Sequence, residues 1–590
     1  MSWNTHIPKF RRFVLQNFPF IEEDFDALTD YALICKVIEY LNQVINSQNE
    51  LISEVETFET NITNGFDRLE TLVVELQNFV NNYFDNLDVQ EEINNKLDAM
   101  VEDGTMASLI DPILTEFEAE VRAEVAKIGD LTLLNTVKKD TIVNGVNCAN
   151  QNYIGLLREK YGNNYLPVDI YENIDFFKEN VVIYKDQFSN NYACYCDLNK
   201  HKNSGGTNIY VDPWTDVPAG EQDGTSTKPY DRLSKGYNAA SNGDTILVAS
   251  GFYDRTQTGN FNFSKSVNIC AKDGEPNKVF FMVCDSLTWE QDSTYSNVYV
   301  TTRSNTTRLI DIRKHADDCF PQLNRVDSLE LCASTLNSYY INGETVYANI
   351  GETVTNDKVR CAISVQSLLR IINNNADTNV YFENITFIGG SSPLVSVNGS
   401  GSYKCQLTAK NCNFYYTSGQ DWDAIPIVGA DAIFVNCKAC YGNKDGFNYH
   451  LTGTRYPHAI EINCVGANNG LERTSASTSN GSTSHAQCKV LRFGGVYFNN
   501  NGANVCDVGT NNLTINIMCK SFDSASYANT AINKNDFSTQ DVGSVMKLYN
   551  CYAKGSNSRV NIYAHDDSTV VVDHCFYDTT GGTGTMTIVE

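Results

Sequence analysis

The sequence predicts two fold classes in one chain, an N-terminal α-helical coiled coil followed by an all-β parallel β-helix. Two observations predict them. Between Leu41 and Tyr83, apolar residues recur in alternating steps of three and four for about six heptads, and a stripe this narrow is buried only by copies of the same helix. The chain that follows is rich in Asn, Gly, Ser, Thr and aromatic residues, and a short motif recurs in it, as in solenoids of stacked β-coils.

The composition narrows the class of function. At 590 residues the chain is long enough for several domains or one long solenoid, and its formal net charge is −27. Nucleic acid and anionic membrane surfaces both require a basic footprint, so neither is expected as a partner. No apolar run approaches the ~20 residues of a membrane span, and the first residues lack the apolar core of a secretory signal.

These patterns divide the chain into four segments. Residues 1–30 are expected to form short helices with exposed aromatic side chains, which either dock on another molecule or fold back on the stalk. Residues 31–130 form the coiled-coil stalk and a helical turn, and Phe58 and Phe79 at core positions favour three strands over two. Residues 131–204 are a neck or linker, and residues 205–590 form the β-helix.

A motif of Asn followed by a small or apolar residue, often Cys, marks successive coils. It occurs at Asn384, Asn411, Asn436, Asn463 and Asn550, and with His in place of Asn at His574. Clear neighbours are about 24 to 27 residues apart, which suits coils that add one strand to each of three parallel sheets. We expect the Asn side chains to stack as a ladder at the bends, and the Cys side chains to be reduced thiols that fill the interior.

The cysteines do not predict a metal site. Cys437-x-x-Cys440 and Cys194-x-Cys196 resemble half-sites, but neither has a second half at the spacing that zinc requires. No metal and no other cofactor is therefore expected.

The start of the solenoid resembles the N-terminal cap and first coil of right-handed parallel β-helices of the pectin-lyase-like group. A strand at Asn208–Asp212 is followed by the turn-rich loop Asp223–Tyr230, a short helix at Leu233–Ala240, and a turn and strand at Asn242–Ala249 that lead into Gly251-Phe-Tyr-Asp254. The match covers about fifty residues. The resemblance implies the fold and says little about activity.

Histidines and acids in the second half of the β-helix could carry chemistry. His450 lies thirteen residues after Cys437, and Asp507 lies thirteen after Gly494, the apparent equivalent on a later coil. If that register holds, His450 and Asp507 project from corresponding strands on one face, and His485 leans over the same strip.

The candidate catalytic residues are Asp445, Asp507, His450 and His485. Glycoside hydrolysis takes two carboxylates, whereas a polysaccharide lyase takes a base matched to the C5 proton and a cation beside the resulting carbanion. Glu461 and Asp573 could supply further carboxylates. The alternative is that these residues have no catalytic role, because Asp-Gly pairs form turns between coils and a His at a strand end is often a surface or core residue with its hydrogen bonds satisfied.

Aromatic side chains in the same region predict glycan binding without cleavage. The candidate binding residues are Trp422, Tyr449, Tyr497 and Arg492, with the Tyr415-Tyr416 pair as a further aromatic segment. The aromatic rings could stack on sugar rings in a groove, and Arg492 could supply a positive charge.

Three further stretches resemble bacteriophage tail fibre and tailspike proteins. Phe18–Asp30 is similar to the virion-attachment segment of fibres from phages of Gram-positive gut bacteria. Tyr83–Asp98, followed by Asp103-Gly-Thr-Met106, is similar to the helix and turn that end the stalk of such fibres. Asn443–His450 and Asn480–Gly509 are similar to parts of their distal pectin-lyase-like domain.

The resemblance implies a homotrimer in the phage virion that is assembled in the host cytoplasm. Its N-terminus attaches to other tail proteins, and its β-helix contacts host surface polysaccharide. The leading hypothesis is a recognition fibre that binds this polysaccharide without cutting it. The alternative is a depolymerase, a lyase or glycoside hydrolase, which requires Asp445, Asp507 and His450 or His485 within about 10 Å of one another. A purely architectural fibre would instead have a uniformly polar surface without an aromatic-lined groove.

Overall fold

The computed structural model describes residues 165–314, 320–364, 368–372, 376–390, 395–399, 403–417, 422–471, 478–524, 534–555 and 560–589. They belong to the second of two compact units, residues 164–590. The predicted segments 1–30 and 31–130, with the coiled coil, lie outside the described residues, as does the first part of the predicted neck. Within the described ranges, no helix is long and apolar enough to cross a membrane.

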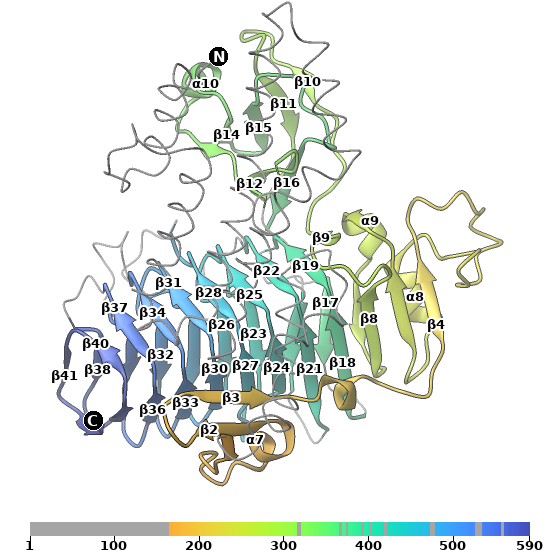
Figure 1. Ribbon diagram of the computed structural model, residues 1–590. Coiled ribbons are helices and arrows are strands. Elements are labelled where there is room, and N and C mark those ends of the chain that lie inside the picture. Colours follow the sequence, from red (N-terminus) through yellow and green to blue (C-terminus); the bar gives the residue numbers. More distant parts are fainter. Residues whose placement is uncertain are drawn as a thin grey trace, which may run out of the picture. The chain divides into compact units, whose positions relative to one another are not determined.

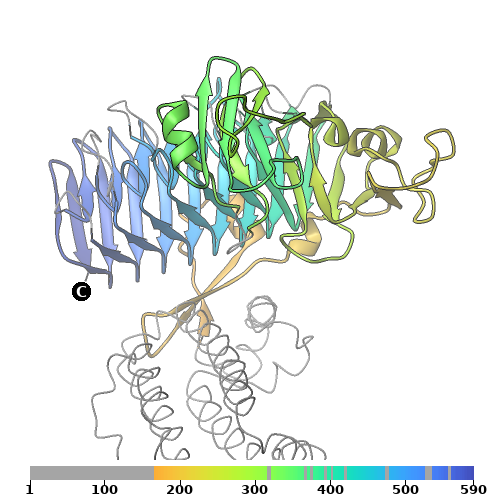
Figure 2. The same cartoon turned by 90° about the horizontal axis from the view of Figure 1, so that it is seen from above.

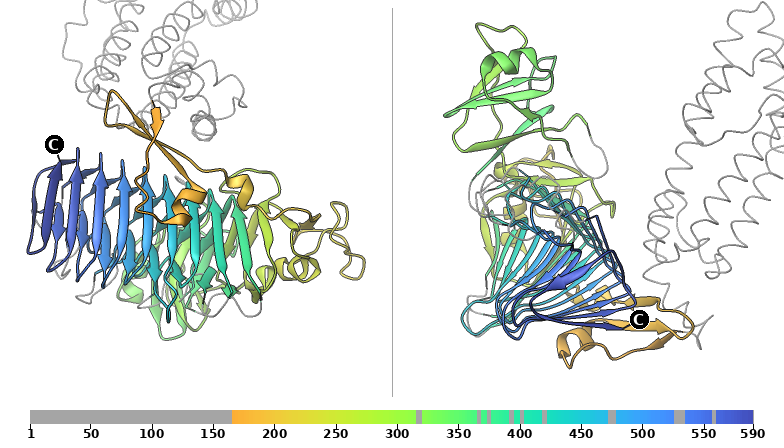
Figure 3. Two further views of the ribbon diagram at one scale, coloured as in Figure 1. Left: turned by 90° about the horizontal axis from the view of Figure 1, so that it is seen from below. Right: turned by 90° about the vertical axis from the view of Figure 1, so that its left-hand side faces the viewer.

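A parallel β-helix forms the body of this unit (Figure 1). Each coil passes through three sheets in turn, which we call the first, second and third sheets, and parallel pairing joins each strand to the corresponding strand of the next coil. The three sheets enclose the core, as the view along the solenoid shows (Figure 3). The all-β parallel β-helix that the sequence predicts is therefore present.

The strand bounds show how regularly the coils repeat. The first sheet contains β4 (Asn208–Val211), β5 (Thr245–Val248), β8 (Val267–Ala271), β18 (Thr378–Glu383), β21 (Cys405–Lys410), β24 (Asp431–Val435), β27 (His458–Ile462), β30 (Lys489–Phe493), β33 (Leu513–Ile517), β36 (Val545–Tyr549), β39 (Thr569–Asp573) and β42 (Thr585–Val589). The second contains β6 (Gly251–Tyr253), β9 (Val279–Met282), β19 (Ile385–Ile388), β22 (Asn413–Tyr415), β25 (Lys438–Cys440), β28 (Val465–Ala467), β31 (Val496–Phe498), β34 (Lys520–Phe522), β37 (Tyr552–Lys554) and β40 (Phe576–Tyr577). The third contains β7 (Phe261–Phe263), β17 (Leu369–Ile372), β20 (Val395–Asn398), β23 (Ile425–Val428), β26 (Phe447–His450), β29 (Ser482–His485), β32 (Val505–Val508), β35 (Phe537–Thr539), β38 (Ile562–Ala564) and β41 (Thr580–Gly582).

The predicted asparagine ladder lies at the bend between the first and second sheets. The side chain of Asn411 donates to Asn384 Oδ1 over 2.9 Å, Asn436 donates to Asn411 over 3.2 Å, and Asn463 donates to Asn436 over 3.4 Å. All four have positive φ, between 50° and 63°. Asn tolerates this left-handed conformation better than most residues, which explains why the motif selects it.

The cysteines that follow the ladder point into the interior, as predicted. Cys412, Cys437, Cys464 and Cys519 are fully buried, and each Sγ lies 3.3–3.6 Å from backbone carbonyl oxygens. The cysteines of the described ranges are free thiols. They behave as small apolar side chains that match the narrow corner of the solenoid.

The predicted start of the solenoid is confirmed. Strand β4 is followed by helix α8 (Leu233–Ala239), then β5 and β6, with the short helix α9 (Arg255–Thr258) after them. Leu233 and Tyr237 of α8 are buried in the cluster that fills the interior of the first coils. Helix α8 thus completes the hydrophobic core at this end.

An insertion between β9 and β17 interrupts the repeat, and the sequence did not predict it. A mostly antiparallel sheet is formed by β10 (Glu290–Gln291), β11 (Tyr299–Thr302), β15 (Thr345–Asn349), β14 (Ser338–Asn342) and β13 (Asn324–Arg325), with helix α10 (Leu329–Ser334) beside it. A separate pair, β12 (Thr306–Asp311) and β16 (Val359–Ile363), connects it to the solenoid. The insertion has its own core around Tyr339 and Val346, and it projects from the side of the solenoid (Figures 1 and 2).

Residues 165–201, which we call the strap, lie across the first sheet (Figure 1). They lie in the segment that the sequence left as a neck and comprise β1 (Tyr165–Pro167), α7 (Asp175–Asn180), β2 (Val182–Asp186), β3 (Tyr192–Tyr195) and the 3₁₀ turn η5 (Leu198–His201). Phe177 and Ile183 of the strap are buried against the outward-facing side chains of β24, β27, β30 and β33.

In the first sheet beneath the strap, apolar side chains face outward and several polar side chains face the interior. Ile460, Leu491 and Ile515 face outward into the strap, whereas Glu461 and Arg492, which follow Ile460 and Leu491 directly, face the interior and are fully buried. Side chains of a strand alternate between its two faces, so an apolar outer face places the intervening polar residues inside. This arrangement determines the outcome for several predicted site residues.

Candidate functional site

A second ladder follows the bend between the second and third sheets. Its members come five residues after Asn384, Asn411, Asn436 and Asn463 and after the equivalent positions Gly494, Met518 and Asn550 of later coils. They have positive φ: Gly389, Tyr416, Tyr441, Asn468, Asn499, Asp523 and Gly555. Gly, Asn and Asp adopt this conformation at low cost, but for bulky side chains it costs roughly 1–2 kcal/mol. Tyr416 and Tyr441, with φ of 60° and 56°, are therefore strained. Strain of this kind is found where a side chain serves a function.

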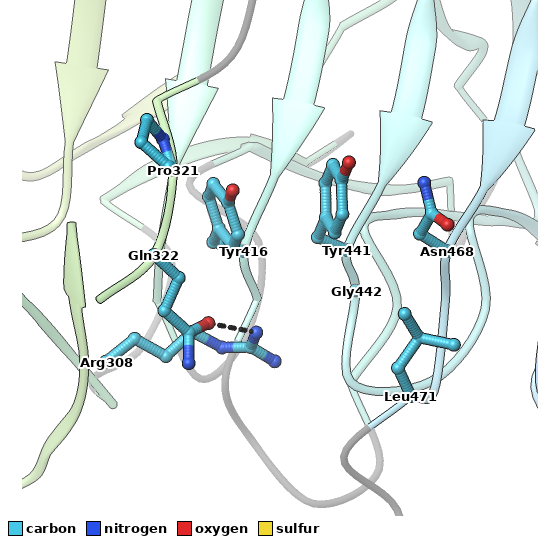
Figure 4. A pocket seen from close by; sticks show the side chains of 8 residues that line it. All are labelled: Arg308, Pro321, Gln322, Tyr416, Tyr441, Gly442, Asn468 and Leu471. Atoms are coloured by element: carbon cyan, nitrogen blue, oxygen red, sulfur yellow. Dashed lines mark hydrogen bonds between the residues drawn. The ribbon is translucent and has the colours of Figure 1, made fainter. Parts of the chain in front are cut away.

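A cavity of about 300 Å³ lies beside the two tyrosines (Figure 4). The solenoid lines it with Tyr416, Tyr441, Gly442, Asn468 and Leu471, and the insertion lines it with Arg308, Pro321 and Gln322. This volume is at the lower end of the range for sites that bind small molecules.

The insertion fixes one of the two rings. Tyr416 is buried and donates its hydroxyl to the carbonyl of Phe320 over 2.7 Å, and the guanidinium carbon of Arg308 lies 5.7 Å from its ring centroid. Arg308 Nη1 donates to Gln322 Oε1 over 2.9 Å. The ring of Tyr441 stacks on Tyr416 with centroids 5.1 Å apart and planes 19° apart, and it is only half-buried (Figure 4).

The described lining combines aromatic carbon, two amides and one guanidinium. The amides of Gln322 and Asn468 can donate and accept hydrogen bonds, and Arg308 can only donate. Such a site suits a ligand with an apolar face and hydroxyl-bearing edges. None of its described lining residues is a carboxylate.

His450 and His485 come together at the ends of β26 and β29. Their rings stack with centroids 3.9 Å apart and planes 13° apart, which places them in the same strip, as the sequence predicted. Burial, with Lys444 as a second cause, lowers the pKa of His450 to about 4. Burial, followed by the charge of His450, lowers the pKa of His485 to about 3. Both imidazoles are therefore weak proton acceptors at neutral pH.

Asp445 lies buried at the bend before β26. Its Oδ1 accepts a hydrogen bond from the Asn480 backbone over 2.8 Å, and its Oδ2 accepts one from Asn448 Nδ2 over 3.1 Å. Burial and the nearby charge of Asp445 raise the pKa of Asp423 to about 7. Trp422, which precedes Asp423, is 47% exposed, so it is the one predicted glycan-binding residue on the open surface of the described chain.

Asp507 does not share the face of the histidines. The strand pairing of β27 with β30 places Gly494 opposite Asn463, so Gly495 is the residue equivalent to Cys464. Asp507 lies twelve residues after Gly495, whereas His450 lies thirteen residues after Cys437. Asp507 therefore pairs with Ser484, the residue before the stacked histidine. A shift of one residue moves a side chain to the opposite face of a strand. Asp507 consequently points into the solenoid.

Four of the predicted site residues lie in the solenoid interior around Glu461. Tyr449 and Tyr497 donate their hydroxyls to Glu461 over 2.9 and 2.7 Å, Arg492 Nε lies 3.5 Å from Glu461 Oε1, and Arg492 Nη1 lies 3.8 Å from Asp507 Oδ1. All five side chains are completely buried. A polysaccharide on the outer surface has no contact with them in this geometry, so neither catalysis nor sugar stacking is supported for these positions.

One guanidinium, that of Arg492, lies between the two interior carboxylates of Glu461 and Asp507. Burial raises the pKa of Asp507, and Arg492 opposes that shift. Burial acts to lower the pKa of Arg492, but Asp507 and Glu461 raise it above its usual value. Ser482 donates to Glu461 over 2.6 Å and accepts from Arg492 over 2.8 Å. The cluster is a paired structural core of the kind that buried charges require.

Sequence reasoning named Tyr416 as an aromatic candidate but missed Tyr441, Arg308 and Gln322. A signal for Tyr441 exists, because both tyrosines stand five residues after a ladder Asn, where other coils have Gly, Asn or Asp. Arg308 and Gln322 have no such signal, since the insertion follows no repeat. Among the described side chains, no group of three or more His, Cys, Asp or Glu residues is arranged to hold a metal ion.

No protein family and no characterised protein matches the sequence. Solved structures that are similar to the chain include a glycoside hydrolase, at 11% identity over 64% of this chain and 96% of that one, with a TM-score of 0.38. A complex of XylC with xylose matches at 10% identity over 65% and 86%, with a TM-score of 0.38. The tailspike protein gp49 of Pseudomonas phage LKA1 matches at 9% identity over 64% and 76%, with a TM-score of 0.21. Values this low carry no argument about function, and the fold assignment rests on the strand pairing itself.

Proposed function

We propose that this chain is a host-recognition protein of a bacteriophage tail and that it binds host surface polysaccharide in the cavity beside Tyr416 and Tyr441. The observation that carries the proposal is the stacked tyrosine pair in the left-handed conformation. Every other member of the second ladder is Gly, Asn or Asp. Two neighbouring coils thus retain strained aromatic rings where an unstrained residue would serve the fold.

The cavity chemistry supports a sugar as ligand. The carbon-bound hydrogens of a pyranose ring form an apolar face that packs on an aromatic ring, and its hydroxyls require donors and acceptors at the edge. The half-buried ring of Tyr441 offers the face, and Asn468, Gln322 and Arg308 offer the polar groups.

The fibre architecture belongs to the same proposal. The heptad period between Leu41 and Tyr83 supports a stalk of identical helices, and the core aromatic residues support a homotrimer. The resemblance of Phe18–Asp30 to virion-attachment segments supports anchoring to other tail proteins through the N-terminus. The β-helix would then be the distal part that meets the host surface.

The test uses the full chain with Tyr441→Asn, which gives this coil the residue that the next coil has at Asn468. Asn relieves the left-handed strain of about 1–2 kcal/mol while it removes the ring, so the melting temperature should stay within a few degrees. Binding to a panel of purified bacterial capsular and wall polysaccharides, measured by biolayer interferometry, should fall at least tenfold. Tyr456→Asn is the matched control, because Tyr456 is 37% exposed and does not line the cavity.

The outcomes decide between the hypotheses. Unchanged binding in Tyr441→Asn would remove the cavity from the function. A fall in melting temperature with unchanged binding would make the tyrosine pair a packing element. The size of each polysaccharide is followed by chromatography in the same experiment, and shortening by the purified chain would favour the depolymerase over the recognition fibre.

A further inference from the structure

Beyond the insertion, the outer face of the second sheet has two pairs of stacked aromatic rings, which the strand register offsets from each other by two residues. Phe498 on β31 stacks on Phe522 on β34 with centroids 5.1 Å apart and planes 4° apart. On the next two strands, Tyr552 of β37 stacks on Phe576 of β40 at 5.4 Å and 11°. Phe576 is 57% exposed and the other three rings are half-buried. We call these four side chains the aromatic strip.

The strip begins on β31, two strands beyond the cavity strand β25. The apolar cluster between the insertion and the second sheet contains Tyr416, and both Tyr441 and Phe498 pack at its edge. Successive strands of a parallel sheet are about 4.8 Å apart. Strand β28, between the cavity and Phe498, has no aromatic ring, and from β31 the two ring pairs extend to β40, the strand nearest the C-terminal end of this sheet in Figure 1.

The charge of this face differs from that of the whole chain. Lys438, Lys520 and Lys554 occupy outer positions of the second sheet, and the seven strands from β22 to β40 in that sheet contain no Asp or Glu. The chain as a whole has 71 acidic and 44 basic residues. The ammonium of Lys554 lies 5.3 Å from the ring centroid of Phe576. The ladder residue Asp523 is at the adjoining bend, one residue beyond Phe522.

We propose that the aromatic strip extends the cavity into a track for an extended anionic polysaccharide. Successive sugar rings would stack on the aromatic side chains while acidic substituents face the lysines. The proposal rests on the proposed function, since the cavity holds one part of the same polymer. Aromatic faces with lysines beside them suit an acidic glycan better than a neutral one, because a carboxylate is attracted to an ammonium group and a hydroxyl gains much less.

A second copy of the chain is a weaker candidate for this face. A stable protein interface buries about 800 Å² on each partner. A fully buried aromatic side chain contributes about 150–250 Å², and the four rings of the strip are already partly covered. The strip therefore offers a few hundred Å², which suits a narrow polymer rather than a stable subunit contact.

The experiment compares polymer length and charge on the full chain. The probes are polygalacturonate, alginate and hyaluronan, each as fragments of two to twelve sugars and as polymer, with their carboxyl-reduced neutral forms. For at least one acidic probe, the polymer should bind at least tenfold more tightly than the shortest fragment that binds, and carboxyl reduction or added salt should remove that gain. The double variant Phe498→Ser/Phe522→Ser and the single variant Lys554→Gln should lower polymer binding to the level of the fragment without changing fragment binding.

The variants separate this proposal from the one on which it rests. Fragment binding that is lost in Tyr441→Asn, without any gain from polymer length, would retain the cavity and overturn the track. Equal binding of acidic and neutral polymers, or no binding of any acidic probe, would also overturn the track. Analytical ultracentrifugation of the double variant covers the remaining case, because a change in oligomeric state would assign the strip to subunit contact instead.

Discussion

The carboxylate of Glu461 accepts a hydrogen bond from the hydroxyl of Tyr497 over 2.7 Å inside the solenoid. The sequence predicts Tyr497 as a glycan-binding residue and Glu461 as a further carboxylate for catalysis. In the structure they form part of a buried polar core, in which Arg492 is the one cation near the carboxylates of Glu461 and Asp507 among the described residues. The core therefore depends on Arg492, since a buried charge without its partner is strongly unfavourable.

Replacing Arg492 by Leu should destabilise the β-helix by roughly 3–5 kcal/mol at neutral pH. Arg492 opposes the rise that burial causes in the pKa of Asp507, so without the guanidinium that pKa rises further, and a raised carboxyl pKa gives stability that is lost as pH rises. The deficit relative to wild type should therefore shrink at pH 4. The measurement is the urea midpoint at pH 7 and pH 4. The exposed Lys272→Leu is the control, and an equal midpoint in both variants would refute the prediction.

The strap should be essential to the first sheet. Phe177→Ala should cost roughly 3–5 kcal/mol, because Phe177 is fully buried against the apolar outer face of β24 to β33. The variant should also bind the dye ANS, which reports exposed apolar surface. Phe188, in the same segment and 79% exposed, provides the control Phe188→Ala, which should change neither the thermal midpoint nor the dye signal.

Two contributions of the asparagine ladder to stability can be separated, the hydrogen bonds between side chains and the tolerance of the left-handed conformation. Asn436 has φ of 52° and hydrogen bonds to Asn411 and Asn463. Asn436→Gly removes the bonds but keeps the left-handed conformation accessible, whereas Asn436→Ala also adds strain of about 1–2 kcal/mol. Thermal denaturation should rank wild type above Gly and Gly above Ala. Equal stability of the Gly and Ala variants would mean that conformation plays no part.

The pH dependence of stability should include a signal from Asp536. Burial raises the pKa of Asp536 to about 8, against a hydrogen bond from Asn561 that lowers it. The folded state thus retains a proton that the unfolded chain has lost, and stability falls as pH rises through 8. Burial also raises the pKa of several cysteine thiols, and these destabilise wild type and variant alike as the unfolded chain ionises. Between pH 7 and 9 wild type should therefore lose about 1–2 kcal/mol more than Asp536→Asn.

The two histidines do not contribute to the change in stability between pH 7 and 9. Burial lowers the pKa of His450 and of His485, so the unfolded chain takes up protons first as pH falls below about 6.5 and stability falls with it. This contribution has the opposite sign and lies at lower pH. An equal change of the wild-type and Asp536→Asn midpoints between pH 7 and 9 would contradict the assignment to Asp536.

Much of the solenoid could be predicted because its signal is local and repeated. An Asn that tolerates a left-handed bend and a Cys that fits a narrow corner recur on successive coils, so each of these residues indicates where in its coil it lies. The insertion between β9 and β17 has no repeat, and its residues Arg308 and Gln322 reach the cavity only through the fold. No local pattern could place them beside Tyr416.

The sequence by itself determined the parallel coils, the asparagine ladder, the buried thiols and the presence of aromatic residues near Tyr416. The tertiary structure decided which way each side chain points. The strand pairing makes Gly495, and not Gly494, the residue equivalent to Cys464, and Asp507 therefore faces the interior. The strap covers an apolar outer face of β30, and Arg492 therefore lies in the core. The physical reason is that side chains of a strand always alternate between its two faces, but which set faces the core depends on what packs against each face.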